Sequence, residues 1–441
     1  MSGTILALLG LGMILLAMIL IFKEICSPFM AFLIISILSA LILGYGNADL
    51  QNWFVEGAKG QAKTIALVIF CISFFYIENE VGAFDDIVDW IVKKFGGKPL
   101  YIMIAGWLVA TLSTLDGQSA STILVTVPAM LPVYKKAKIR PLFLCFQIAS
   151  VMGVMGIVPW SQVNLLNASQ LGVDGYATFA SHGLLTVMLL SWVISFALML
   201  VYGTFEIKRI RAGKNDYLVG DLDAGPGARV DQVTDRQKKM RPFNFVLIIA
   251  LIVCLFTGLV TDVVASALAL VLVLLINYDG KTMRKAFSKC APMCLGSISI
   301  ILCVGIWMQV FRGTGMMSAL VDALMSLLPA GLVKYAHIIF ALIKTPVDFF
   351  LCNSLAMSVV PVVGDLVTTA GACSMETAHA MITCASACGM VCCASAAYQF
   401  VLLDMAGGVS LKDHAKYALP RMSLQAVIMT LIMVVFGYAF M

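Results

Sequence analysis

Long apolar runs recur along almost the whole chain, from residue 4 to residue 440. Most runs hold 17 to 25 residues, and a helix that rises about 1.5 Å per residue needs about 20 residues to cross the hydrocarbon core of a bilayer. Charged residues make up only 12% of the chain, about half of what an ordinary soluble domain carries. The sequence therefore predicts an all-α polytopic membrane protein and excludes a soluble globular fold.

Ten of the apolar runs are expected to be full spans. They lie near residues 3–22, 25–46, 62–80, 142–171, 177–205, 243–260, 263–278, 290–311, 376–404 and 418–440. No basic residue precedes the first run and Lys23 follows it, so we expect a retained span rather than a signal peptide. The formal net charge of +5 comes from basic residues in loops, which indicates topology rather than a nucleic-acid partner.

Two further stretches, residues 99–134 and 331–370, are apolar at both ends and polar in the middle. Each limb holds about 13 to 16 residues, or about 20 to 24 Å as helix, which is short for a crossing. Each stretch is therefore predicted to be a re-entrant hairpin that enters and leaves the membrane on one side.

The charges at the two ends of the first hairpin agree with this prediction. Basic residues flank it on both sides: Lys93, Lys94 and Lys98 before it, and Lys135, Lys136, Lys138 and Arg140 after it. The resulting topology places Lys23, the basic residues of 208–241 and 281–289, and Lys412, Lys416 and Arg421 on the same side, or 24 of the 29 basic residues in all. The positive-inside rule then predicts a multi-pass protein of the inner (cytoplasmic) membrane.

One long polar connection, residues 207–242, is predicted to be a cytoplasmic linker because it holds Gly225-Pro226-Gly227 and many charges. It divides the chain into residues 1–206 and 243–441. We expect the first half to contain the hairpin 99–134 and a broken helix at 142–171, and the second half to contain the hairpin 331–370 and a broken helix at 376–404.

The two halves share residues in the same order. The matching pairs, offset by about 232 to 236 residues, include Gly82 with Gly315, Asp116 with Asp348, Pro128 with Pro361, and Gly153 with Gly389. Each half is expected to hold five full spans. Because this number is odd, the second half starts on the opposite face, and the repeat is inverted, as is typical of alternating-access transporters.

Both hairpin tips, residues 113–122 and 345–354, are rich in polar groups. A turn inside the membrane leaves backbone amides that protein, water or a ligand must satisfy. Amides and hydroxyls at the start of a short helix favour an anion such as a carboxylate. Polar tip residues are therefore candidates for substrate binding: Gln118 and Ser119 in the first tip, Asn353 and Ser354 in the second.

Asp116 and Asp348 are unsuited to holding an anion because like charges repel. An acid inside the membrane is costly and usually serves transport, so both are candidates for binding a co-transported cation or proton. The alternative is that each Asp only caps a half-helix by accepting from backbone amides. The two roles can coexist.

The predicted breaks lie at residues 153–162, which contain Pro159, and at residues 386–395, which contain no proline. Polar side chains near the breaks are further candidates for donating to a carboxylate: Ser161, Gln162, Asn164, Ser395, Tyr398 and Gln399. Polar residues that join helices in lipid are the alternative for each of them.

The remaining features are expected to be structural. Cys384, Cys388, Cys392 and Cys393 lack the His or carboxylate support that a metal site needs, so helix packing is favoured. Glu78 and Glu80 are expected to be solvated at the interface, and His337 and His379 to lie near the outer surface. Residues 84–95 have apolar positions at helical spacing and are expected to form an interfacial helix.

The motifs resemble the citrate-metal-proton symporter family. The resemblance is carried by Leu115-Asp116-Gly117 with its Ser/Thr-rich turn, by Pro128-Ala129-Met130-Leu131-Pro132, by the segment from Gly153 to Trp160, and by Gly408-Val409-Ser410-Leu411-Lys412-Asp413-His414. Two positions depart from the family pattern, because Gln118 stands where the family usually has an acid and Ser161-Gln162-Val163 replaces a Gly-Gly-Pro run. Without an acid at position 118, co-transport of a divalent metal with the substrate is less favoured.

The resemblance implies an elevator-type transporter with paired re-entrant hairpins and a scaffold that forms a homodimer. It also implies that one side of the site is lined by Asp116, Gly117, Ser119, Ser121 and Thr122 with Pro159 and Trp160, and the other by Pro346, Asp348 and Phe349.

The expected function is secondary transport of a small organic anion, a citrate-like di- or tricarboxylate. Coupling to H⁺, Na⁺ or a chelated divalent metal is expected, and no bound cofactor. A cation/proton antiporter of the same superfamily is the alternative. A membrane-embedded enzyme is disfavoured because the chain has no HExxH motif and no nucleophile elbow.

Overall fold

The structure is a computed structural model that describes residues 3–23, 25–83, 86, 90, 93–94, 98–213, 233–257, 259–391, 397–407 and 409–441. Every regular element in these residues is helical. Five helical stretches are long and apolar enough to cross a membrane, and six shorter apolar helices accompany them. Large apolar side chains such as Leu8, Val193 and Val246 are 58 to 65% exposed, as expected where lipid is the solvent.

The first half contains α1 (Gly3–Phe22), α2 (Pro28–Ile42), α3 (Asn47–Leu67), a π-helical turn (Val68–Ile72), α4 (Ser73–Glu80), α6 (Pro99–Ser113), a 3₁₀ turn (Thr114–Asp116), α7 (Ser119–Lys136), α8 (Pro141–Met155), α9 (Gln162–Leu171), α10 (Gly175–Ser181) and α11 (Leu184–Arg211). The second half contains α12 (Asp235–Thr257), α13 (Asp262–Asn277), α14 (Gly280–Gly313), α15 (Met316–Leu327), α16 (Ala330–Lys334), α17 (Ala336–Thr369), α18 (Met375–Met390), α19 (Ala397–Met405), α20 (Leu411–Val435) and a 3₁₀ turn (Tyr438–Phe440).

All ten predicted spans coincide with helices, but several boundaries differ. The spans predicted at 62–80 and 290–311 are the apolar parts of helices that begin at Asn47 and Gly280, because a helix continues past the membrane surface while hydropathy detects only its apolar part. For the same reason the predicted linker 207–242 was too long. α11 continues to Arg211 and α12 begins at Asp235, and the residues that follow Asp235 are mostly good helix formers. The predicted interfacial helix at 84–95 lies largely outside the described residues.

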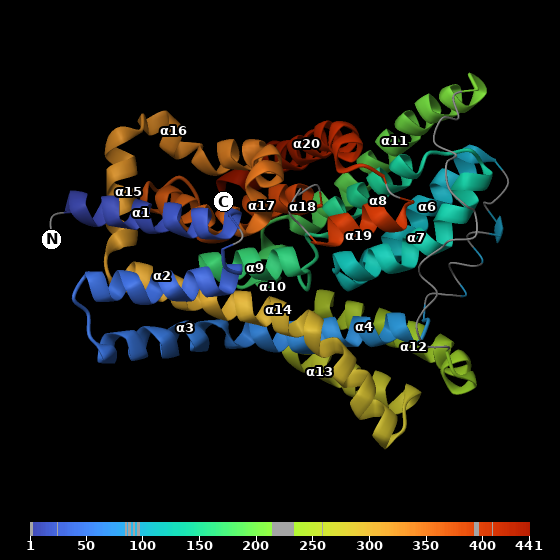
Figure 1. Ribbon diagram of the computed structural model, residues 1–441, viewed down its shortest axis with the longest axis horizontal. Helices are drawn as coiled ribbons and strands as arrows, with labels where there is room; N and C mark the ends of the chain where they lie inside the picture. Colours follow the sequence, from blue (N-terminus) through green and yellow to red (C-terminus); the bar gives the residue numbers. More distant parts are fainter. Residues whose placement is uncertain are drawn as a thin grey trace.

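The two halves present their elements in the same order. A pair of helices (α1 and α2, or α12 and α13) precedes a long helical stretch, which is Asn47–Glu80 in one half and α14 in the other, each of 34 residues. Both long stretches pack against each other where Gly57 meets Gly305, since a Cβ on Gly305 would stand 2.7 Å from the carbonyl oxygen of Gly57. Figure 1 shows α1 and α2 at one end of the long axis and α12 and α13 at the other.

The segment predicted as the first hairpin folds back on itself. Thr122 at the start of α7 donates to the carbonyl of Ser113 at the end of α6 (3.4 Å), while Tyr134 near the end of α7 packs against Gly106 of α6. The stretch Pro99–Asp116 nonetheless reaches 18 residues and meets the length for a crossing, because the 3₁₀ turn lengthens the first limb. The length of each limb alone therefore does not decide whether this segment crosses the membrane or returns to the side from which it entered.

The segment predicted as the second hairpin is assigned as one helical element, α17, yet its two ends lie close together. Leu366 near the end of α17 shares an apolar cluster with Val333, which lies shortly before the start of α17. Phe340 shares another apolar cluster with Val360. A straight helix of 34 residues would separate its ends by about 50 Å. α17 therefore folds back between these contacts, where the side chains of residues 349–358 lie outside the description.

The helices form two packed groups, which we call the long-helix group (α1–α4 and α12–α15) and the broken-helix group (α6–α11 and α17–α20). In the broken-helix group α8 crosses α18 and α20, and Ser150 of α8 donates to Gln425 of α20 (2.6 Å). Tyr134 hydrogen-bonds Gln147 of α8, whose amide donates to the carbonyl of Met103 (2.9 Å). The fold-back of α6 and α7 is thus fixed to α8.

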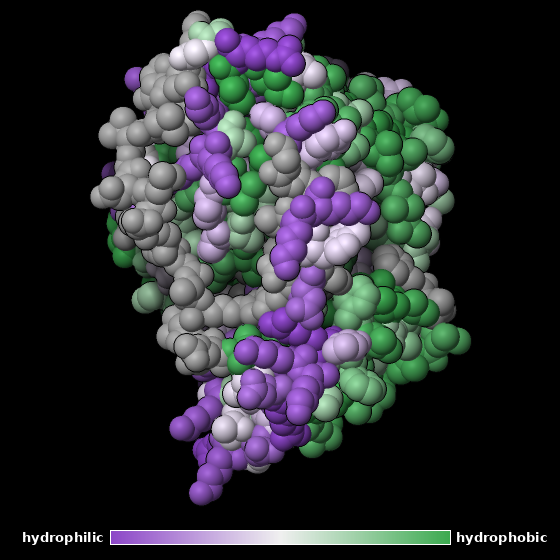
Figure 2. Space-filling view, turned by 90° about the vertical axis from the view of Figure 1, so that its right-hand side faces the viewer, coloured by the Kyte–Doolittle hydropathy of each residue, from purple (hydrophilic) through white to green (hydrophobic). Residues whose placement is uncertain are grey.

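The end of the molecule at the right of Figure 1 carries a band of hydrophilic residues next to a hydrophobic area, as Figure 2 shows. The basic ends of α7 and α11 lie there, in agreement with the predicted grouping of positive charge. The loop between α1 and α2, which holds Lys23, lies away from this end (Figure 1). α1 and its short neighbour α2 turn before reaching that end, and the side of the membrane on which Lys23 lies stays a prediction.

Candidate functional site

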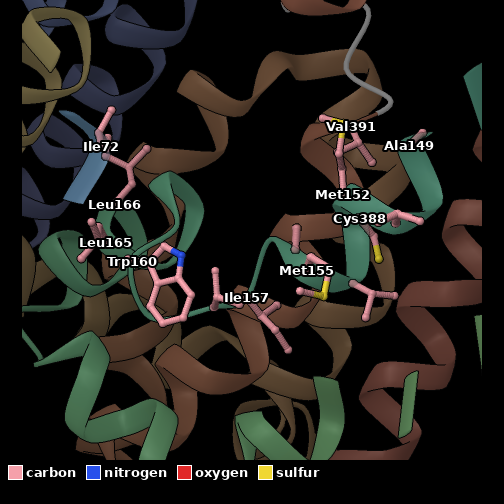
Figure 3. Close-up of a cluster of buried hydrophobic side chains, with 14 of the residues drawn as sticks. Ile72, Ala149, Met152, Met155, Ile157, Trp160, Leu165, Leu166, Cys388 and Val391 are labelled. Atoms are coloured by element: carbon pink, nitrogen blue, oxygen red, sulfur yellow. The ribbon is translucent and has the colours of Figure 1, made fainter. Parts of the chain in front are cut away.

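The first predicted tip meets the first predicted break. Trp160 in the break donates through Nε1 to the carbonyl of Leu115 in the tip (2.8 Å). Gly117 has φ +70°, and a Cβ there would stand 2.8 Å from Cα of Ser161. Figure 3 shows Trp160 and Ile157 on the turn between α8 and α9, and Met152 of α8 beside Cys388 of α18 and Val391 just past its end. Only glycine fits at position 117, since both its conformation and this contact exclude a side chain.

The break itself is held by its own polar side chains. Ser161 caps α9 by accepting from the backbone N–H of Asn164 (3.1 Å), and its hydroxyl donates to the carbonyl of Gly156 (2.5 Å). The side-chain amide of Asn164 donates to the carbonyl of Ile157 (3.1 Å). Ser161 and Asn164, predicted as substrate ligands, are thus engaged in satisfying the carbonyls that the interrupted helix leaves open.

A small pocket of about 20 Å³ lies where the tip, the break and α18 come together. Its lining includes the predicted residues Gly117, Gln118, Ser119 and Gln162, with Ala387 of α18. The first residues of α7 and of α9 both line it, so two helix N-termini converge there, and Ala387 near the C-terminal end of α18 lines it as well. This volume holds about one water molecule, so a carboxylate as large as citrate requires the tip and the break to separate.

Asp116 is buried at the tip, with 4% exposure. Its Oδ1 accepts from the backbone N–H of Gln118 (2.8 Å), the residue that immediately precedes α7. Thr122 on the next turn donates to the carbonyl of Gln118 (2.8 Å). The side chain of Ser121 lies outside the description.

Asp348 has a partner that the sequence reasoning missed. Lys344, one helical turn earlier in α17, places its ammonium 2.7 and 2.9 Å from the two carboxylate oxygens of Asp348. The exposed fractions of the two side chains are only 1% and 0%. Asp348 also packs directly on Gly389, because a Cβ on that glycine would overlap its carboxylate. The four-residue spacing of Lys344 and Asp348 was the available signal.

The second break has the predicted position. α18 ends at Met390 and α19 begins at Ala397, although Ser395 itself lies outside the described residues, as do the side chains of Asn353, Ser354 and Phe349. Gln399 is fully buried, and neither atom of its amide has a hydrogen-bond partner within the described structure. Tyr398 beside it is half-buried.

The two groups of helices meet at a second, larger cavity that the sequence did not indicate. It has a volume of about 410 Å³ and lies between α3, the C-terminal end of α9 and α14. Lys63 of α3 bridges Asp174, which caps α10, and Asp262, at 2.6 and 2.8 Å. Burial works against ionisation of Asp174, but the contacts with Lys63 and with backbone amides outweigh it and lower its pKa.

One expectation about titratable residues was wrong. Glu78 is not solvated, because its side chain has no exposed surface. Of the two glutamates at this helix end only Glu80 is partly exposed, and it pairs with Lys289 at 2.7 Å. His337 and His379 are buried within the protein, and their depth near the outer face of the membrane stays a prediction. His337 lies under the C-terminal residues and bonds the carbonyl of Ala439 (3.0 Å), and His379 lies against α9.

No group of three or more His, Cys, Asp or Glu side chains in the described part of the chain is arranged to hold a metal ion. Cys384 and Cys388 are buried in the contact of α18 with α8 and α20, where Cys388 lies 3.6 Å from the sulfur of Met429. Their surroundings are those of packing residues.

Comparison with known proteins bears on the chemistry of this site. Residues 1–389 match the family model described as "Citrate transporter". The chain is 28% identical over 434 residues to a Bacillus subtilis (strain 168) protein named citrate transporter, covering 98% of this chain and 99% of that protein. It is also 28% identical over 440 residues to that organism's Mg(2+)/citrate complex secondary transporter, covering 98% of each.

Among solved structures, the Alcanivorax borkumensis YdaH transporter is similar in fold. Its TM-score is 0.59 with 12% sequence identity, and the match covers 93% of this chain and 99% of that one. This likeness concerns the fold alone. The family and the two relatives are transporters rather than enzymes, as the sequence predicted.

Proposed function

Because this chain belongs to the citrate transporter family, we propose that it is a secondary active transporter of a citrate-like di- or tricarboxylate in the inner membrane. One observation carries the proposal. The N-termini of α7 and α9 converge on the pocket between the tip and the break, and the partial positive charge at helix N-termini favours a carboxylate.

The same pocket offers a place for a cation. Ala387 of α18 and Val391, the residue just past its end, also line the pocket, and helix C-termini carry partial negative charge. A carboxylate with an accompanying cation therefore matches both kinds of helix terminus. Ser119 and Gln162 are the polar side chains that we expect to contact the carboxylate, with Gln399 joining them from α19.

Energy requires a coupled ion. Moving one net negative charge inward against 100 mV costs about 2.3 kcal/mol, and a trivalent anion faces about three times that. We propose coupling to H⁺, Na⁺ or a chelated divalent metal. Of the two acids predicted to hold the coupling ion, Asp348 already has the Lys344 ammonium at that place, which directs attention to other acids.

The mechanism that we propose is an elevator movement of the broken-helix group against the long-helix group, in a homodimer. The matched order of elements and the placement of α1 and α2 opposite α12 and α13 (Figure 1) support an inverted repeat. The fold-backs of α6 with α7 and of α17 support a re-entrant hairpin in each half. The contacts between the groups include the bridge of Lys63 to Asp174, and these contacts would change during the cycle.

Replacing Gly117 tests the proposal. Gly117→Ala introduces a Cβ 2.8 Å from Cα of Ser161 at φ +70°, so we expect loss of citrate uptake in proteoliposomes with the protein still folded. Gly371→Ala is the matched control, because Gly371 also has a left-handed φ of +64° but nothing lies within 4 Å of its added Cβ. Equal uptake by the two variants would contradict the assigned site. The alternative, a cation/proton antiporter, would show a Na⁺-driven pH change without any anion.

A further inference from the structure

Glu78 on α4 is an acid that has no ion-pair partner in the part of the chain that the structure describes. Its side chain has no exposed surface, and neither carboxylate oxygen has a hydrogen-bond partner among the described residues. Other buried acids are satisfied: Asp116 by the amide of Gln118, Asp348 by Lys344, and Glu206 by Arg140 and Arg209. An ionised carboxylate held without donors is very costly, so this geometry requires the protonated form of Glu78.

Among the described residues, the elements that pack on α4 bring no charge that would change this conclusion. Ser73 and Glu80 mark the side of α4 that faces α14, through Cys290 and Cys294 and through Lys289. Glu78 is two residues from Glu80, or about 200° around the helix, so it points away from that ammonium. From α13 the titratable groups near this region are Asp262, bound to Lys63, and Tyr278 just past its end, which lies near Glu80.

The side of α4 that carries Glu78 touches the candidate site. Phe75, about one turn earlier on the same side, stacks on Trp160 with ring centroids 6.0 Å apart. Trp160 in turn donates to the carbonyl of Leu115 in the tip. Glu78 therefore lies one helical turn from the contact between the long-helix group and the part of the broken-helix group that holds the candidate site.

We propose that Glu78 is the binding site for a coupling proton, which it holds in the conformation described here and releases when the contact at Trp160 opens and water reaches it. The proton bonds to a carboxylate oxygen on loading and leaves to water on release. This inference rests on the proposed transport function and names one of its coupling ions.

The test uses the purified full-length protein in proteoliposomes with an imposed pH gradient, labelled citrate and an internal pH dye. One proton carried per citrate multiplies the accumulation ratio about tenfold for each unit of pH gradient. Glu78→Gln fixes the side chain in a neutral form, so we expect that factor to be lost while citrate/citrate exchange continues. Glu80→Gln is the matched control, since Glu80 is paired with Lys289, and it should keep the factor. Comparing the two variants removes the effect of pH on the ionisation of citrate.

The inference would be overturned if Glu78→Gln and Glu80→Gln carried the same number of protons per citrate. It would also be overturned if a folded Glu78→Gln protein lost citrate/citrate exchange as well as proton coupling. Should Glu78→Gln fail to fold, Glu78→Asp must retain the ratio, and its loss there would also overturn the inference.

Infrared spectroscopy supplies a readout that needs no transport. The wild-type protein should show the carbonyl stretch of a protonated carboxyl that Glu80→Gln keeps, and absence of that band counts against Glu78. Absence of citrate uptake in the wild type, with the band present, would refute the proposed function instead.

Discussion

The buried pair of Lys344 and Asp348 makes a strong prediction about coupling between two substitutions. At separations of 2.7 and 2.9 Å, unit charges attract by about 6 kcal/mol at an effective dielectric constant of about 20. Desolvation of both ions offsets most of this, so the net contribution of the intact pair to stability is small. Removing one partner, in contrast, strands the other charge in a site with at most 1% exposure.

We therefore expect Lys344→Met and Asp348→Asn each to destabilise the protein by about 3 to 5 kcal/mol. The double variant leaves only a buried amide, so its loss of stability should be about 1 to 3 kcal/mol. The sum of the two single losses should therefore exceed the loss in the double variant by at least about 3 kcal/mol. The measurement is the unfolding midpoint of the four proteins in an SDS titration of mixed micelles. A double variant as unstable as the sum of the single variants would refute the reasoning, because additivity means that the two groups do not interact.

Two further predictions concern the surroundings of the site. Gln147→Leu removes the partner of the Tyr134 hydroxyl, so we expect a lower midpoint of thermal unfolding and a cost of about 1 to 3 kcal/mol in the free energy of unfolding. The double variant Tyr134→Phe/Gln147→Leu should recover part of this loss. If the double variant recovers nothing, the hydrogen bond does not contribute to stability. The pKa of Asp174 is lowered, so its bridge to Lys63 contributes stability above the ordinary pKa of Asp and loses it as pH falls through the lowered value. Asp174→Asn keeps the helix cap and should be less stable than wild type at pH 6 but equal to it at low pH, and a difference that persists in acid would contradict this.

Apolar run length predicted the positions of the helices well. The ten spans and both breaks coincide with helices and helix ends, because hydrophobic length and helix-breaking residues such as Pro159 act locally. The boundaries at Asn47 and Asp235 were missed because polar residues extend a helix without any signal in hydropathy.

The candidate site was predicted less completely, because its residues are decided by tertiary contacts. The sequence brought residues 113–122 and 153–162 to attention, and the structure places them together. It did not reveal that Ser161 and Asn164 are occupied by carbonyls of the break, nor that Lys344 neutralises Asp348. Burial of Glu78 also depends on which elements cover the end of α4, which no local pattern encodes.

The crossing of the helical stretch Asn47–Glu80 with α14 at Gly57 and Gly305 has a mechanical consequence. At this point main chain touches main chain, since an added Cβ on Gly57 would stand 2.8 Å from Cα of Ile306. An added Cβ on Gly57 would meet main-chain atoms alone, so no rotamer change on that side can absorb sliding or tilting, and we expect this contact to stay fixed. Displacements during a working cycle must be taken up elsewhere, and a single methyl group at either glycine should spread the two long helices apart over their whole length.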